Sequence, residues 1–231
     1  MDPRNPDILF ASSWNRIRTP YDLTSGGPGS GLWKTSDAGN TWTEISGNGF
    51  PTTMKGRIGI AIARSNPRYI YTWVEADTLP MPMKKGQKPD TAKAQRLNSG
   101  IYRSTDGGTT WSLMRRNEQS NARANYSEAR PFYYSQIRVD PKNPERIYWM
   151  SSVFHFSDDG GKTDRRGALS LHTDWHAMWI DPNDPDHFVL GEDGGIGITW
   201  DKGGTYDFPA LMPLGQFYAV SYDMQKLYRV C

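Results

Sequence analysis

The sequence contains one cysteine in 231 residues, and it is the last residue, Cys231. A single cysteine cannot form an internal disulfide or a cysteine-based metal site, so a packed core has to stabilise the fold. An excess of charge of one sign is lacking too, because 27 Lys and Arg residues face 25 Asp and Glu residues. This balance argues against the strongly basic surface of nucleic-acid-binding proteins, and we expect no nucleic acid as a partner.

Long hydrophobic runs are also absent. The longest apolar stretches, such as residues 58–63, are far too short to cross a bilayer, so we expect no membrane partner. The first residues lack the apolar core of a signal peptide, which predicts a soluble chain without a leader. Nine Trp and twelve Tyr residues are present, however, and such aromatic content is typical of folded chains.

Two motifs recur along the chain and alternate with one another. The first, which we call the Asp-Pro turn, is Asp-Pro-x-Asn-Pro followed by a short apolar run. Copies begin at Asp2, Asp140 and Asp181, and a degraded copy covers residues 64–67. Proline fixes φ, and Asp or Asn side chains bond to the backbone nearby, so each copy predicts a turn between two strands.

The second motif, which we call the aspartate turn, is [Ser/Thr]-x-Asp-x-Gly-x-Thr followed by an aromatic residue. Its four aspartates are Asp37, Asp106, Asp159 and Asp201. In the third copy Asp164 stands where the aromatic residue is expected. The carboxylate can accept backbone N–H groups and glycine permits positive φ, so this motif predicts a hairpin turn. Because four equivalent copies indicate a structural role, we do not expect these aspartates to be catalytic.

The four aspartate turns resemble the Asp box, or BNR repeat, of sialidases, xyloglucanase-type glycoside hydrolases and sortilin-like domains. The pairing of Asp-Pro turns with these boxes is similar to that of bacterial BNR-repeat and sortilin-like glycosyl hydrolases. The resemblance implies an all-β fold, a β-propeller of four-stranded antiparallel blades, in a single domain over residues 1–231. One fold hosts many functions, so it implies less about activity.

The repeat predicts four blades and one extra strand. Propeller repeats occupy roughly 40–50 residues. We place the blade units at residues 2–48, 57–115, 134–167 and 175–211, and the extra strand at residues 216–223. Either this strand completes the first blade and closes a ring of four blades, or the chain is part of a larger propeller. In the second case, open strand edges favour self-association.

Both motifs are expected on the same face of the propeller, because A–B and C–D turns lie at the same end of a blade. The opposite face then collects the long connections, which we expect to be loops. These are residues 14–30, 76–99, 117–131 and 165–174. Function concentrates on loops held by a rigid scaffold, so the candidate site is expected at the mouth of this loop face.

The segment from Leu171 to His176 leads into a first strand at that mouth. In an extended chain, residues two apart share a face, so His172, Asp174 and His176 are expected to point together. Glu192 and Asp193 begin a loop on the same face. These five residues are our candidate catalytic residues: two carboxylates that meet there can act as an acid–base pair on a glycoside.

A second interpretation of the same residues is a metal site. Imidazoles and carboxylates can hold calcium or another divalent metal, with His172, Asp174, His176 and Asp193 as the expected ligands. Aromatic, arginine and polar residues at neighbouring loop-face positions are candidates for substrate binding. They are Trp14, Arg16, Glu75, Tyr133, Tyr134, Gln136 and Tyr218.

Three functions remain open from the sequence. The first is a hydrolase acting on a glycoside at the loop face, and the second is a metal-dependent lactone or ester hydrolase. The third is a non-catalytic module that binds a peptide or glycan, as the sortilin-like resemblance implies. In all three cases the expected partner is a small molecule, a carbohydrate or a peptide. No three arginines occupy equivalent positions in the blades, which argues against a sialidase-type clamp.

Overall fold

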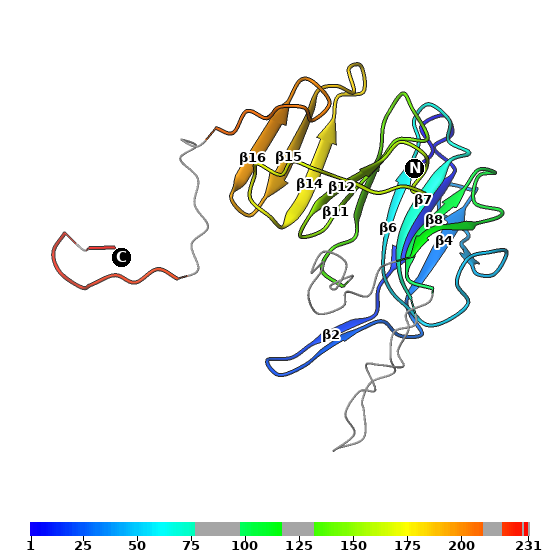
Figure 1. Cartoon of the computed structure of the whole chain (residues 1–231). Helices are drawn as coiled ribbons and strands as arrows, with labels where there is room; N and C mark the ends of the chain where they lie inside the picture. The colour runs from blue at the N-terminus through cyan, green and yellow to red at the C-terminus, as the bar shows by residue number, and fades with distance from the viewer. Residues whose placement is uncertain (77–97, 117–131, 210–218, 228, 231) are drawn as a thin grey trace.

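The computed structural model describes residues 1–76, 98–116, 132–209, 219–227, 229 and 230. In these residues the chain is all-β, and the sheets follow one another along the chain as the blades of a β-propeller do (Figure 1). No helix long and apolar enough to span a membrane occurs in them.

Blades 2 and 3 each have four antiparallel strands in chain order. Blade 2 consists of β6 (Lys55–Ile62), β7 (Ile70–Ala76), β8 (Gly100–Ser104) and β9 (Ser112–Arg116). Blade 3 consists of β10 (Gln136–Val139), β11 (Ile147–Met150), β12 (Phe154–Ser157) and β13 (Arg165–Gly167). The propeller expectation of four-stranded meanders is therefore confirmed for both.

Blades 1 and 4 are three-stranded sheets. Blade 1 consists of β1 (Leu9–Ser13), β4 (Gly31–Thr35) and β5 (Thr43–Ile45). Blade 4 consists of β14 (Trp175–Ile180), β15 (Phe188–Glu192) and β16 (Gly195–Thr199). In place of a fourth strand, Asp207 forms an isolated bridge with Ile198. Of the extra strand predicted at residues 216–223, residues 216–218 lie outside the described part. Residues 219–223 form no sheet strand, so that part of the prediction is wrong.

The core lies between consecutive blades, and strands β7 and β11 show how the sequence builds it. Ile70 and Val74 pack toward blade 1, whereas Tyr71 and Trp73, which alternate with them, pack toward blade 3. On β11, Trp149 likewise belongs to the blade 2–3 core and its neighbours to the blade 3–4 core. Successive side chains of a strand point to opposite faces, so a strand buried on both faces is apolar without a break.

The two turn motifs of each blade meet through one backbone hydrogen bond. The residue after each turn aspartate donates its N–H to the carbonyl of the residue that follows the Asp-Pro turn. The four bonds are Ala38 to Asp7, Gly107 to Arg68, Gly160 to Glu145 and Lys202 to Asp186, at 2.8–3.0 Å. Both motifs therefore lie on one face of the molecule, the turn face, as the sequence predicted.

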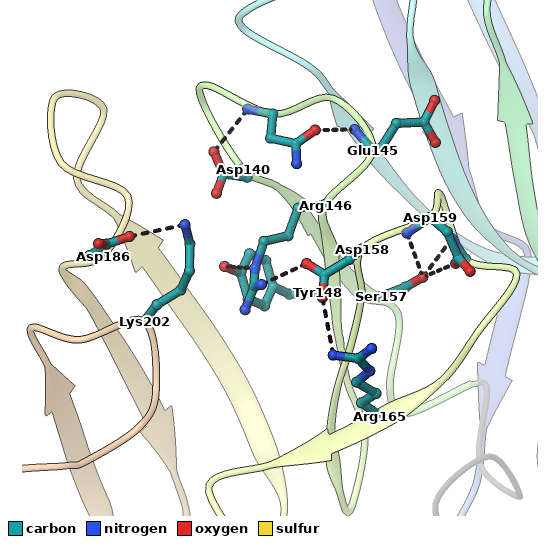
Figure 2. A network of polar contacts seen from close by, with 12 residues as sticks. Asp140, Glu145, Arg146, Tyr148, Ser157, Asp158, Asp159, Arg165, Asp186 and Lys202 are labelled. Atoms are coloured by element: carbon teal, nitrogen blue, oxygen red, sulfur yellow. Dashed lines mark hydrogen bonds and ion pairs between the residues drawn. The ribbon is translucent and has the colours of Figure 1, made fainter.

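Figure 2 shows this turn face in blade 3. The hydroxyl of Ser157 donates to the carboxylate of Asp159 at 2.6 Å, as in the other three aspartate turns. Beside it, Arg146 donates to Asp158 at 2.6 Å and to the Tyr148 hydroxyl at 2.7 Å. These polar contacts join the turns of the turn face. The other connections between strands lie on the opposite face, the loop face.

Two connections expected to be loops contain strands. Residues 14–30 include a hairpin of β2 (Arg16–Arg18) and β3 (Leu23–Ser25), which projects from blade 1 (Figure 1). Thr19 closes its turn by accepting the N–H of Asp22 at 3.0 Å. Residues 165–174 begin with β13, which completes blade 3. The hairpin was not predicted because its two strands are only three residues long and mostly polar, whereas β13 falls at the end of the blade unit predicted at residues 134–167.

Candidate active site

The first part of the candidate site joins the entrances of blades 3 and 4. Tyr134 lies just before β10, is buried, and its hydroxyl donates to the Asp174 carboxylate just before β14. Asp174 has a φ of 71°, a left-handed conformation that is uncommon for a residue other than glycine. Its backbone N–H donates to the Ser152 carbonyl at 3.3 Å. Residues of blade 3 thus bind both the side chain and the backbone of Asp174.

The second part is an imidazole–carboxylate pair. His176 Nε2 on β14 lies 2.9 Å from Asp193 Oδ1, in the turn between β15 and β16, and both side chains reach solvent. The His176 ring stacks on Tyr134 at a centroid distance of 5.8 Å and an angle of 21°. Tyr133 meets the same ring edge-on at 5.4 Å. Tyr134 therefore contacts both Asp174 and His176, so two of the three candidate carboxylates, Asp174 and Asp193, lie around one aromatic cluster.

Glu192 lies deeper than Asp193, and the exposed side chain of His172 lies next to it. The Glu192 side chain is 0% exposed and accepts the N–H of Gly194, while its second oxygen has no hydrogen-bond partner among the described residues. His172 Nδ1 lies 2.8 Å from the Thr173 carbonyl and 3.6 Å from Glu192 Oε2. Glu192 is thus covered by its own turn, whereas Asp193 faces outward.

The expected convergence of His172, Asp174 and His176 does not occur. Strand β14 begins only at Trp175, and its pairing with β15 is irregular between Trp175 and Ala177. Without an extended chain before Trp175, the two-residue alternation does not apply there. The three side chains instead contact Glu192, Tyr134 and Asp193 respectively.

No group of three or more His, Cys, Asp or Glu side chains placed to hold a metal occurs in the described part of the chain. The divalent-metal site therefore stays a prediction from the sequence.

The predicted substrate-binding residues divide into two groups. Trp14 lies beneath the guanidinium groups of Arg16 and Arg57, each 5.2 Å from the ring centroid, and donates to Ser25 at 3.1 Å. Glu75 is buried; it accepts the Ser25 hydroxyl at 2.5 Å and the Arg57 N–H at 3.0 Å. Glu75 thus anchors the hairpin to blade 2 rather than facing the surface.

The other group stands at the entrance of blade 3. Tyr133 is 48% exposed, and its carbonyl accepts from Arg57 at 2.6 Å. Gln136 begins β10 and pairs with Met150 in the sheet. Tyr218 lies outside the described residues.

A cleft of about 530 Å³ opens between the hairpin and Tyr133. Its lining includes Arg16, Arg18 and Tyr21 of the hairpin together with Phe132. Tyr21 was not predicted because residues 14–30 were expected to be an irregular loop, and Phe132, next to the predicted Tyr133, was not predicted either. The alternation in Arg16-Ile17-Arg18, which puts both arginines on one face, was the available signal.

Among known proteins, the chain is similar to several solved structures. No family model matches the sequence, and no curated protein matches it. Among solved structures, an ancestral GH74 enzyme is similar over 89% of this chain and 25% of its own, at 13% identity and a TM-score of 0.48. The GH74 enzyme of Niastella koreensis is similar over 90% and 39%, at 12% identity and a TM-score of 0.39.

A third similar structure is that of YCF48 bound to D1 peptide. The similarity extends over 84% of this chain and 57% of the YCF48 chain, at 14% identity and a TM-score of 0.45. The chain thus spans less than two thirds of each of these proteins. At such identities and TM-scores we take nothing about activity from them. The strand order and the packing of consecutive sheets define an all-β protein of the β-propeller type.

Proposed function

We propose that this protein is a hydrolase that cleaves a glycosidic bond on the loop face, with Asp174 and Asp193 as its two carboxylates. The supporting observation is the aromatic cluster that both contact: Tyr134 donates to Asp174 and stacks on His176, which pairs with Asp193. Glycoside hydrolysis generally needs two carboxyl groups, one to protonate the leaving oxygen and one to activate water or attack the sugar.

In this mechanism the Asp193 carboxylate, oriented by His176, takes a proton from a water molecule as the water oxygen bonds to the anomeric carbon. Asp174 acts in its protonated form and gives its carboxyl proton to the glycosidic oxygen as the bond between that oxygen and the sugar carbon breaks. The Tyr134 hydroxyl donates to the Asp174 carboxylate that remains. Exposed Tyr133 offers an aromatic surface on which a sugar ring can stack. Glu192, whose side chain is covered, supports the turn that carries Asp193.

The test is hydrolysis of a panel of glycosides by the full chain and by Asp174→Asn and Asp193→Asn. General acid–base groups contribute roughly 10²–10⁴-fold, so each variant is expected to lower kcat at least about 10²-fold. Asp186→Asn is the matched control, because Asp186 is an exposed carboxylate on the turn face, paired with Lys202. Unchanged kcat in both site variants would overturn the proposal.

The panel also includes esters and lactones, each with and without a chelator. Turnover of these substrates that a chelator abolishes would favour the metal-dependent hydrolase predicted from the sequence. The exposed ring of Tyr133 beside a cleft also suits a binding module without catalysis. In that case, ligand binding would survive the loss of both carboxylates and no substrate would be turned over.

A further inference from the structure

The cleft beside the hairpin shares one residue, Tyr133, with the candidate active site. Tyr133 lines the cleft and also contacts the His176 ring, which pairs with Asp193. A ligand chain that extends from the cleft past Tyr133 would therefore approach this imidazole–carboxylate pair. The volume of about 530 Å³ falls within the usual range of ligand pockets.

The cleft carries positive charge that its own walls do not balance. Arg16 and Arg18 lie two residues apart on β2 and both line the cleft. Within the described residues neither guanidinium forms a salt bridge, and that of Arg16 lies 5.2 Å from the centroid of the Trp14 ring. The described lining contains one carboxylate, that of Asp22, which accepts the N–H of Leu23 at 2.8 Å.

A third positive charge stands behind this pair. Arg57 lies over the same Trp14 ring as Arg16. Burial, the largest influence, and the charge of Arg16 both lower the pKa of Arg57, while Glu75 opposes them. Because the positive charges of Arg16 and Arg57 lie near each other, a negatively charged ligand bound beside them is favoured.

Aromatic rings flank the arginines. Tyr21 at the tip of the hairpin is 97% exposed, and Tyr133 closes the other end of the cleft. Aromatic faces suit the apolar faces of sugar rings, and guanidinium groups bind acidic groups through paired hydrogen bonds. Alternating rings and cations match an oligosaccharide that carries acidic groups.

We propose that this cleft binds an acidic oligosaccharide, with Arg16 and Arg18 contacting its carboxylate or sulfate groups and Tyr21 and Tyr133 stacking on its rings. This inference rests on the proposed function, since it assigns the substrate class of the same site. A neutral sugar would leave both guanidinium groups without a counter-charge.

The experiment is calorimetric titration of the full chain with tetragalacturonate, a sulfated oligosaccharide and the neutral cellotetraose at low salt. We expect one or both acidic ligands to bind at least tenfold more tightly than the neutral one, and added salt to weaken that binding. The tighter of the two acidic ligands identifies the acidic group. Arg16→Gln and Arg18→Gln are each expected to raise Kd about tenfold, the loss of one charge-assisted hydrogen bond.

The matched control is Arg64→Gln, since Arg64 is exposed and lies in the degraded Asp-Pro turn. Arg16→Lys and Arg18→Lys, which keep the charge, are expected to recover part of the affinity. Equal binding of acidic and neutral ligands, or an unchanged Kd in both Gln variants, would overturn the inference. So would binding of an acidic peptide in place of the acidic sugars.

Turnover separates this inference from the proposed function. Tight binding of acidic oligosaccharides without hydrolysis would support the inference and contradict the hydrolase. Hydrolysis of neutral glycosides that depends on Asp174 and Asp193, without preference for acidic ligands, would support the hydrolase and contradict the inference.

Discussion

Asp164 occupies the position that Trp42, Trp111 and Tyr206 occupy in the other aspartate turns. Instead of an aromatic contact, Asp164 lies 2.7 Å from His155 Nδ1 on β12 and 3.0 Å from Arg115 on β9. His155 is buried and stacks on Trp149 at 5.2 Å. The Asp164 carboxylate thus joins blade 2 to blade 3. This contact between blades accounts for an aspartate where the other turns have an aromatic residue.

Substituting Asp164 tests this ion bridge. The Asp164 side chain is only 17% exposed, and its charge neutralises that of Arg115. Because Asp164→Asn removes this charge, we expect the free energy of unfolding to fall by about 3 kcal/mol. Asp186→Asn, which breaks an exposed pair, is expected to cost less than about 1 kcal/mol. Urea unfolding of both variants measures the difference, and equal losses would contradict the assignment.

The same residue gives a pH dependence with a defined sign. Burial raises the pKa of Asp164, but the hydrogen bond with His155 and the charges of His155 and Arg115 outweigh it, and the pKa is lowered. A lowered pKa in the folded state means that the stabilisation is present above the usual value of 3.8 and is lost as the pH falls through the folded value.

At the scale of the element, each blade is closed by its two turns. The turn aspartate accepts a hydroxyl two residues before it and an N–H four residues after it, as Asp37 does from Thr35 and Thr41. The hydrogen bond from Thr35 is the largest cause that lowers the pKa of Asp37 to about 2. The other three turn aspartates also have a pKa of about 2.

Replacing one turn aspartate tests this contribution. For Asp106, burial raises the pKa, but hydrogen bonds from Thr110 and Ser104 outweigh it. We expect Asp106→Asn to lower Tm at pH 7 by about 2–4 °C, the shift that about 1 kcal/mol produces in a domain of this size. Because the pKa is lowered, this difference should shrink as the pH falls from 4 to 2. A difference that is the same at pH 7 and pH 2 would show that the carboxylate charge does not stabilise the turn.

At the scale of the whole molecule, the blades pack against one another at their first strands. A Cβ atom added to Gly59 on β6 would lie 1.7 Å from the carbonyl oxygen of Ser135, just before β10. Backbone occupies that space and cannot rotate away as a side chain could. The approach of blades 2 and 3 therefore requires glycine at this position.

Gly59→Ala is expected to lower the free energy of unfolding by about 1–3 kcal/mol, the usual cost of overpacking. Gly191→Ala is the control, because its added Cβ would make an ordinary 3.4 Å contact with Ala177. Thermal unfolding of both variants measures the effect. An equal Tm for the two would contradict the close approach of blades 2 and 3.

The sequence alone determined the turns, the strands that flank them and the order of the blades. The hydrogen bonds that define an aspartate turn join residues at most four apart. Asp106, for example, accepts from Ser104, two residues before it, and from Thr110, four residues after it, so a short motif specifies the turn. The continuous apolar runs of β7 and β11 likewise follow from burial on both faces. These features depend on local chemistry that repeats along the chain.

Only the tertiary structure decided which side chains meet. Tyr134 and Asp174 are 40 residues apart and come together because blades 3 and 4 pack side by side. Within blade 4, the pairing of β14 with β15 brings His176 to Asp193, while Glu192, which precedes Asp193 in the chain, turns inward. The hairpin that carries Arg16 and Arg18 is held by a buried contact between Ser25 and Glu75, 50 residues apart. Contacts of this kind depend on how the blades pack, and no local motif encodes them.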